Sequence, residues 1–191
     1  IMSTNKKISI IGLGYVGLPL ATEFAKKYLV VGYDIDTKRI KELKLGVDRT
    51  KEITNKKLLT NNNLIFTNDL NYMKNSDFFI LTVPTPITRD NKPDLSIIRK
   101  AALSVVKVLK KGATIILEST VYPGVTEDYL VPIIEKHGKL QHKKDFFVAY
   151  SPERINPGET KYKLTKIKKV VGADCKTTLN KVSKIYRDII K

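Results

Sequence analysis

Three glycines near the start of the chain have the spacing of a phosphate-binding turn. Gly12, Gly14 and Gly17 stand in G-x-G-x-x-G order. In such a turn the first glycine permits a tight bend, the second lets the backbone approach a pyrophosphate, and the third lets a helix pack closely on a strand. The helix that follows would offer its free N–H groups to the phosphates. The spacing alone is a weak signal, so the flanking elements decide what it means.

Those flanking elements are a strand, a helix and a second strand. The β-branched run at 8–11 has the composition of a buried parallel strand, and the apolar residues of 18–25 recur with helical period. A second strand at 29–33 ends in Asp34, about 20 residues past the glycines, where a dinucleotide-binding fold places its ribose-binding carboxylate. The order therefore predicts dinucleotide binding, and Asp34 favours NAD over NADP because a carboxylate repels a 2′-phosphate.

The rest of the chain continues the alternation of strands and helices. Further strands are predicted at 64–67, 77–83, 113–117 and 146–150, with an edge strand at 169–172. Helices are predicted at 37–45, 69–74, 95–109, 126–136 and 177–191. This alternation predicts an α/β fold, a Rossmann-like, doubly wound, mostly parallel sheet with helices on both faces. The polar segment 48–63 is predicted to be irregular with one helical turn, and its sequence suggests no task.

Length and cysteine content limit the classes of protein. The 191 residues suffice for one α/β domain, predicted at 1–174, while 175–191 would begin a helix that leads to a second domain absent from this chain. That helix reaches the last residue without a stop signal, which predicts a cut chain. Cys175 is the only cysteine, and the two histidines have no cysteines nearby, so neither a disulfide nor a metal site is expected. With no long apolar run and no leader, the prediction is a cytoplasmic protein without membrane insertion.

The charge is strongly basic, with 35 Lys and Arg against 19 Asp and Glu and a net charge of +16. A basic domain can bind nucleic acid. Here the lysines are scattered in pairs, and no aromatic residues are interleaved with them. The pattern favours lysine-rich solvated faces that help to attract an anionic substrate, with nucleic-acid binding as the weaker alternative.

Three predicted strands end in polar segments that could meet at one edge of the sheet. These segments are V-P-T-P at 83–86, E-S-T-V-Y-P-G at 118–124 and S-P-E-R-I-N-P-G at 151–158. Open α/β sheets bind ligands at the carboxyl edge of their strands, and a carboxylate there can take a proton from water if its pKa is suitable. Ordinary structural roles remain open: Thr85 and Thr120 as strand-end hydroxyls, Glu153 as a cap, and Arg154 as a surface ion-pair partner.

Five motifs in order and spacing resemble one known family. G-L-G-Y-V-G-L-P, Y-D-I-D, V-P-T-P, E-S-T-V-Y-P-G-V-T-E and S-P-E-R-I-N-P-G look like the amino-terminal NAD-binding domain of the UDP-glucose/GDP-mannose dehydrogenases. The last motif and P-D-L-S at 93–96 look most like UDP-N-acetylhexosamine 6-dehydrogenases of capsule and O-antigen synthesis. The resemblance covers essentially the whole chain. It implies oxidation of the sugar C6 alcohol to a uronate with two NAD⁺, through a cysteine thiohemiacetal, by a homodimer.

The resemblance also implies roles for individual residues. The cofactor positions beyond the three glycines would be Tyr15 and Val16 at the pyrophosphate, Asp34 and Arg39 at the adenosine ribose, and Thr85 and Thr120 beside the nicotinamide. Catalytic proton handling on the hydrolytic water would fall to Glu153 together with Thr120. The UDP-sugar, which carries N-acetylglucosamine, N-acetylgalactosamine or N-acetylmannosamine, would meet Arg154 and Ile155.

Two departures from the family pattern matter. UDP-glucose enzymes place a second glutamate four positions after the first, where this chain has Pro157, as expected for the N-acetylhexosamine branch. The family's nucleophilic cysteine falls beyond residue 191, and Cys175 lies outside the matching motifs. A UDP-glucose 6-dehydrogenase and a non-catalytic NAD-binding regulatory module remain the alternative interpretations.

Overall fold

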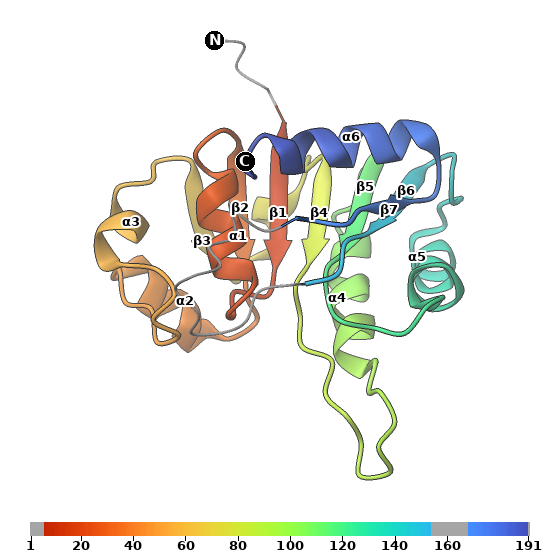
Figure 1. Cartoon of the computed structure of the whole chain (residues 1–191), viewed down its shortest axis with the longest axis horizontal. Helices are drawn as coiled ribbons and strands as arrows, with labels where there is room; N and C mark the ends of the chain where they lie inside the picture. Colours follow the sequence, from red (N-terminus) through yellow and green to blue (C-terminus); the bar gives the residue numbers. More distant parts are fainter. Residues whose placement is uncertain (1–5, 154–167, 191) are drawn as a thin grey trace.

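A computed structural model describes residues 6–153 and 168–190. Its seven strands form one sheet in the order β3-β2-β1-β4-β5-β6-β7, parallel except for β7, which runs antiparallel to β6. The predicted mostly parallel, doubly wound sheet is confirmed (Figure 1). The strands are β1 Lys7–Ile11, β2 Leu29–Tyr33, β3 Leu64–Thr67, β4 Phe78–Leu81, β5 Ala113–Leu117, β6 Phe146–Tyr150 and β7 Gly172–Ala173.

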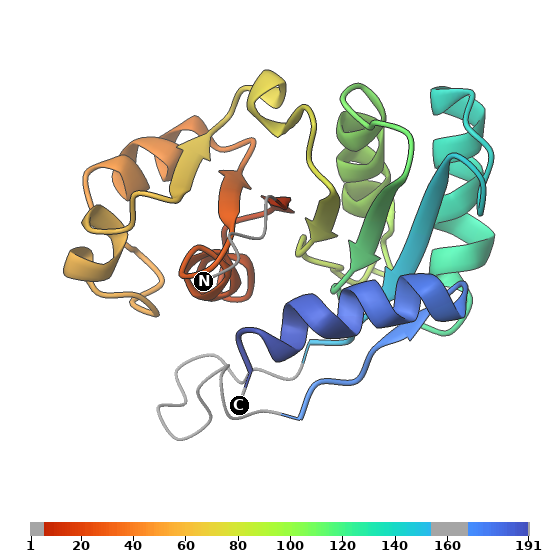
Figure 2. The same cartoon turned by 90° about the horizontal axis from the view of Figure 1, so that it is seen from above.

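Helices cover both faces of the sheet (Figure 2). They are α1 Gly17–Phe24, α2 Thr37–Lys44, α3 Asn55–Leu59, the 3₁₀ helix η1 Leu70–Met73, α4 Ser96–Val106, the π-helix η2 Val125–Leu130, α5 Val131–Gly138 and α6 Lys176–Arg187. One hydrophobic core lies under α1, α2, α3 and α6, and the other lies under α4, η2 and α5. Strands β4 and β5 are buried along their whole length, as parallel strands covered on both faces require.

The strand order places β1 between β2 and β4, so the chain reverses its direction across the sheet at β1. In open α/β sheets this reversal creates the crevice in which ligands bind. The glycine turn follows β1 directly, and the loops after β4, β5 and β6 leave from the same carboxyl edge. The fold therefore gathers the predicted site segments without any further rearrangement.

Several predicted boundaries differ from the structure. The edge strand is Gly172–Ala173 rather than 169–172, because the side chain of Lys169 is buried in the domain interior, where it pairs with Glu118, and residues 168–171 do not join the sheet. The helix predicted at 126–136 is a π-helix that continues as α5, and the one predicted at 69–74 is a 3₁₀ turn. Helix α6 packs its apolar side on the same core as α1. Within the described residues, no helix has the length and apolar character needed to cross a membrane.

Candidate cofactor site

The three glycines of the turn have different surroundings. Gly12 has a φ of +95°, and a Cβ there would lie 3.0 Å from the carbonyl oxygen of Thr82. At Gly17 a Cβ would lie 1.8 Å from the carbonyl oxygen of Gly12, closer than any real contact. At Gly14 a Cβ would meet nothing within 4 Å. Gly12 and Gly17 thus shape the turn, whereas Gly14 borders open space.

Helix α1 begins at Gly17 with an N-terminus that is open to an anion. Val16 occupies the N-cap position, so no side chain caps the helix, and the first turn carries no acidic residue. Uncapped N–H groups at a helix N-terminus attract phosphate through their dipoles and hydrogen bonds. Tyr15 stands beside this helix end with 49% of its surface exposed. Tyr15, Val16 and Gly14 therefore border the same opening above the turn.

Asp34 at the end of β2 also supports the turn. Its Oδ2 accepts a hydrogen bond of 2.8 Å from the backbone N–H of Leu13, and its Oδ1 accepts one of 2.9 Å from the N–H of Asp36. Each carboxylate oxygen has a further lone pair, and the half-buried side chain keeps part of its surface in solvent. Asp34 therefore still has acceptor capacity for ribose hydroxyls.

Arg39, expected at the adenosine ribose, is buried beneath the turn instead. Its Nε donates to the carbonyl oxygen of Leu13 at 2.9 Å, and its Nη2 pairs with Asp48 Oδ1 at 2.8 Å. The side chains of Arg39 and Asp48 are only 2% and 1% exposed. Sequence reasoning missed Asp48, whose one signal was the turn-forming Asp-x-Thr pattern that it makes with Thr50.

The loops after β4 and β5 meet at the carboxyl edge. The hydroxyl of Thr85 donates to the backbone oxygen of Thr120 at 2.7 Å, and that of Ser119 donates to the oxygen of Val83 at 2.5 Å. Thr120 itself is exposed. The structure therefore brings together the two threonines that were predicted to lie beside the nicotinamide.

Glu153 follows β6 at the same edge, with its side chain 11% exposed and its Oε2 lying 3.9 Å from Lys169 Nζ. Lys169 Nζ also reaches the backbone oxygen of Pro152 at 3.4 Å. The predicted substrate residues Arg154 and Ile155 lie outside the described residues. Among the predicted catalytic residues, Glu153 therefore has a cation beside it that sequence reasoning did not identify.

That cation belongs to a buried polar cluster of Glu118, Lys169 and Tyr186. Lys169 Nζ forms an ion pair with Glu118 Oε1, which also accepts a hydrogen bond of 3.0 Å from the hydroxyl of Tyr186 on α6. Burial raises the pKa of Glu118, and the charge of Lys169 acts against that rise. Burial and the neighbouring Glu118 raise the pKa of the Tyr186 hydroxyl well above its usual value. The cluster joins the end of β5 to α6 and to the segment before β7.

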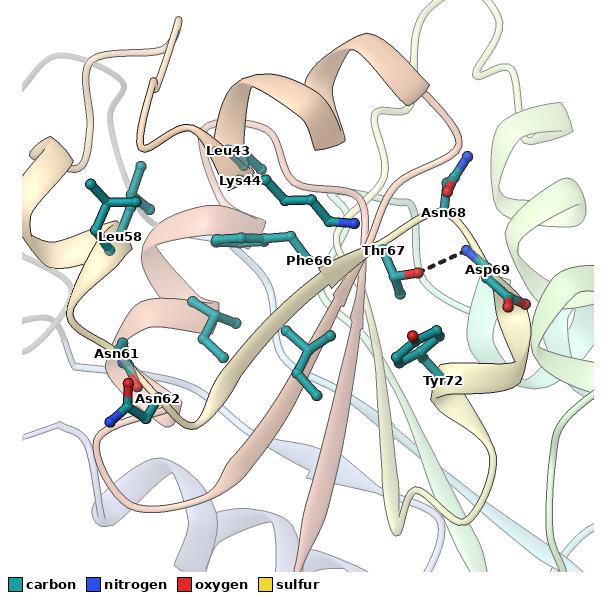
Figure 3. Close-up of a pocket in the computed structure, with 13 residues that line it drawn as sticks. Leu43, Lys44, Leu58, Asn61, Asn62, Phe66, Thr67, Asn68, Asp69 and Tyr72 are labelled. Atoms are coloured by element: carbon teal, nitrogen blue, oxygen red, sulfur yellow. Dashed lines mark hydrogen bonds between the residues drawn. The ribbon is translucent and has the colours of Figure 1, made fainter.

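Several hollows in the described part of the chain lie apart from the glycine turn. One of about 620 Å³ runs along the outer edge of β3 and is lined by residues such as Phe66, Thr67 and Tyr72 (Figure 3). None of its lining residues belongs to the predicted site. A second hollow, of about 540 Å³, lies between residues 121–124 and the β6–β7 edge, next to Thr120. The convergence of functional groups, rather than the size of a hollow, therefore defines the candidate site.

Comparison with known proteins gives the family. Residues 6–190 match the model of the NAD-binding domain of the UDP-glucose/GDP-mannose dehydrogenase family. The chain is 48% identical over 184 residues to UDP-N-acetyl-D-glucosamine 6-dehydrogenase of Pseudomonas aeruginosa and 47% identical over 186 residues to Protein CapL of Staphylococcus aureus. These matches cover 96% and 97% of this chain but 44% of each relative.

A solved structure agrees with this assignment. The UDP-D-ManNAc dehydrogenase of Pyrococcus horikoshii superposes with a TM-score of 0.90 at 37% identity, over 97% of this chain and 45% of that one. The chain thus spans less than half the length of the proteins that it matches. The chain belongs to the UDP-glucose/GDP-mannose dehydrogenase family, and its residues 6–190 correspond to that family's NAD-binding domain.

Proposed function

We propose that the chain is the NAD-binding part of a UDP-N-acetylhexosamine 6-dehydrogenase. The complete enzyme would oxidise the C6 alcohol of the sugar to the uronate with two NAD⁺, as a cytoplasmic homodimer in surface-polysaccharide synthesis. The observation that carries the proposal is the meeting of the glycine turn, the Thr85–Thr120 contact and Glu153 at one sheet edge. Relatives in Pseudomonas aeruginosa and Salmonella typhi, 48% and 47% identical, are named UDP-N-acetyl-D-glucosamine 6-dehydrogenases, which supports this substrate class.

The proposed cofactor site follows from the geometry. NAD⁺, when bound, supplies the hydride acceptor. The open N-terminus of α1 and the space above Gly14 would receive the pyrophosphate, with Tyr15 and Val16 beside it. Asp34 would accept hydrogen bonds from the ribose hydroxyls, and the loops of Thr85 and Thr120 would border the nicotinamide. Arg39 would act indirectly, because its guanidinium holds the Leu13 carbonyl within the turn.

The proposed proton chemistry rests on Glu153. Its carboxylate would take a proton from the hydrolytic water, and Thr120 would help to orient that water. Lys169 Nζ, 3.9 Å from Glu153 Oε2, would help to hold the carboxylate in position beside that water. Arg154 and Ile155, which follow Glu153 directly, remain the proposed contacts to the sugar nucleotide.

The nucleophilic cysteine of this proposal lies outside the 191 residues. Cys175 stands at the N-cap of α6, and its Sγ lies 3.1 Å from Thr178 Oγ1. Because β7 runs antiparallel to β6, and the N–H of Asp174 donates to the carbonyl oxygen of Val148, the chain has returned toward the amino edge of the sheet by residue 175. The thiol is therefore at the wrong end of β6 to attack a substrate beside Glu153. We also propose that α6 leads on to the further domain of the complete enzyme.

The first test is cofactor choice. The chain is expected to bind NAD⁺ more tightly than NADP⁺, because the carboxylate of Asp34 would face the added 2′-phosphate. Calorimetric titration of the purified chain with both cofactors measures the two affinities. Equal affinities would contradict the assignment of Asp34 to the ribose.

The second test is turnover. The purified chain is expected to produce no NADH from UDP-N-acetylglucosamine, UDP-N-acetylgalactosamine or UDP-N-acetylmannosamine. Most contacts to the sugar nucleotide would come from the further domain of the complete enzyme, so the first hydride transfer lacks a bound substrate, and the second also requires a nucleophile to hold the aldehyde. NADH absorbance at saturating NAD⁺ measures this. The positive control is the same chain joined to the remaining carboxyl-terminal residues of the Pseudomonas aeruginosa relative, which is expected to turn over. Steady NADH production by the chain alone would overturn this placement of the nucleophile and return attention to Cys175.

A further inference from the structure

We infer that Asp48 determines cofactor choice by keeping Arg39 buried beneath the glycine turn. Asp48 is the first residue of the polar segment 48–63 between α2 and β3, for which the sequence predicts no function. The inference rests on NAD binding by this domain and not on the identity of the sugar. It assigns Asp48 as a positioning residue, which acts on the cofactor through Arg39 and Leu13.

The carboxylate of Asp48 is held in place by hydrogen bonds from its own segment, in addition to its ion pair with Arg39. Its Oδ1 accepts hydrogen bonds from the N–H of Thr50 at 3.0 Å and from the hydroxyl of Thr50 at 2.7 Å. Its Oδ2 accepts from the N–H groups of Glu52 at 2.9 Å and Ile53 at 3.0 Å. Five donors, including Arg39 Nη2, thus surround one buried carboxylate. Although burial alone would raise the pKa of Asp48, these hydrogen bonds lower it overall, so Asp48 stays charged and keeps its hold on the guanidinium.

Arg39 carries this constraint to the turn. With Nη2 bound to Asp48, its Nε donates to the carbonyl of Leu13, the residue whose N–H is already held by Asp34. Leu13 lies between Gly12 and Gly14, so the two peptide groups on either side of its Cα are each held by one hydrogen bond where the backbone approaches the pyrophosphate. Loss of Asp48 would loosen the Leu13–Gly14 peptide and weaken the binding of either cofactor.

The same constraint removes a cation from the ribose region. Dinucleotide-binding folds accommodate a 2′-phosphate with an arginine near the end of the second strand, and Arg39 lies five positions after Asp34. In this structure Arg39 is 2% exposed and bound to protein groups. Arg49 is the other arginine nearby. It is 45% exposed and pairs with Asp36 and with Glu42. Carboxylates therefore dominate the ribose region, and releasing Arg39 would reduce that dominance.

The experiment measures the dissociation constants of both NAD⁺ and NADP⁺ and compares their ratio between variants. In Asp48→Asn, calorimetry is expected to show NAD⁺ binding weakened by about tenfold, the equivalent of one charge-assisted hydrogen bond. The ratio of the NADP⁺ to the NAD⁺ dissociation constant is expected to fall, because the freed Arg39 can meet the 2′-phosphate. Adding Arg39→Gln to Asp48→Asn is expected to restore the ratio. Adding Arg49→Gln instead is the matched control, and it is expected to leave the lowered ratio unchanged.

Two results would overturn the inference. One is an equal loss of affinity for both cofactors in Asp48→Asn, which would leave Asp48 with a structural role only. The other is restoration of the ratio by Arg49→Gln, which would identify Arg49 as the cation that meets the phosphate. If circular dichroism shows that Asp48→Asn does not fold, the single variant Arg39→Met decides. It is expected to weaken both cofactors by the same factor, and a larger loss for NADP⁺ would show that Arg39 was never sequestered.

Discussion

Replacement of Gly14 by valine is expected to abolish NAD⁺ binding while the domain stays folded. A Cβ at this position meets no atom within 4 Å, and Gly14 is absent from the glycines with positive φ, so the backbone accepts a side chain. The space that the valine fills is the space that the backbone leaves for a pyrophosphate. Calorimetry should detect no binding, while the melting temperature stays close to that of the unchanged protein.

Gly17→Ala is the matched control. It adds a smaller side chain to the same turn, yet it is expected to lower the stability of the domain, whereas Gly14→Val is expected to remove cofactor binding and leave stability unchanged. A Cβ at Gly17 would lie 1.8 Å from the carbonyl oxygen of Gly12 and 2.4 Å from Thr82 Oγ1, so α1 must move away from β1. Overpacking of this kind costs about 1–3 kcal/mol, and a domain of this size loses about 2–4 °C in melting temperature for each kcal/mol. If Gly14→Val melted as low as Gly17→Ala, with no separate binding defect, Gly14 would have a structural role instead.

The sequence predicted those features whose cause is local. Strands β3, β5 and β6 begin and end where the apolar runs do, because a parallel strand covered on both faces needs continuous apolar composition. The glycine turn could also be predicted from the sequence, because each of its three positions requires the space that a residue without a side chain leaves free. The predicted convergence of the strand-end loops followed from the parallel sheet itself, in which all carboxyl ends share one edge.

Features that depend on distant polar partners could not be predicted. Arg39 lies on the first turn of α2, where the family resemblance predicts contact with the adenosine ribose. Only the fold shows that its guanidinium binds Asp48 and the carbonyl of Leu13. The sequence predicts Lys169 as part of an edge strand at 169–172. Its pairing with Glu118 keeps that segment out of the sheet. A single sequence gives no information on which charged side chain, far along the chain, will neutralise a buried one.

Replacement of Lys169 by methionine is expected to destabilise the domain by about 3–5 kcal/mol, since removal of one partner leaves a buried charge uncompensated. Glu118 is fully buried, its Oε1 is bound by Lys169 and Tyr186, and its Oε2 has no hydrogen-bond partner within the described part of the chain. Methionine nearly matches the aliphatic length of lysine, so the packing over the Tyr186 ring, 5.6 Å from Lys169 Nζ, changes little. Chemical denaturation measures the loss in free energy of unfolding.

The pH dependence separates the charge of Glu118 from packing. Burial already raises the pKa of Glu118 above its usual value, and loss of Lys169 removes the charge that lowers it. Between the unfolded and the folded pKa the folded state binds more protons, so stability falls as the pH rises through that window. The destabilisation by Lys169→Met should therefore be smallest at acidic pH, where Glu118 is protonated, and grow as the pH rises through the usual range of a glutamate. A loss that stayed constant with pH would point to packing instead.

Two further variants complete the test. Adding Glu118→Gln to Lys169→Met removes the uncompensated charge and is expected to recover much of the lost stability, since removal of both partners of a buried pair is often nearly neutral. Lys111→Met breaks the ion pair of Lys111 with Asp145, in which the lysine is 76% exposed, and it is expected to cost less than about 1 kcal/mol. Because Lys169 also approaches Glu153, recovery of stability in the double variant without recovery of turnover in the fused enzyme would assign Lys169 a part in positioning Glu153 as well.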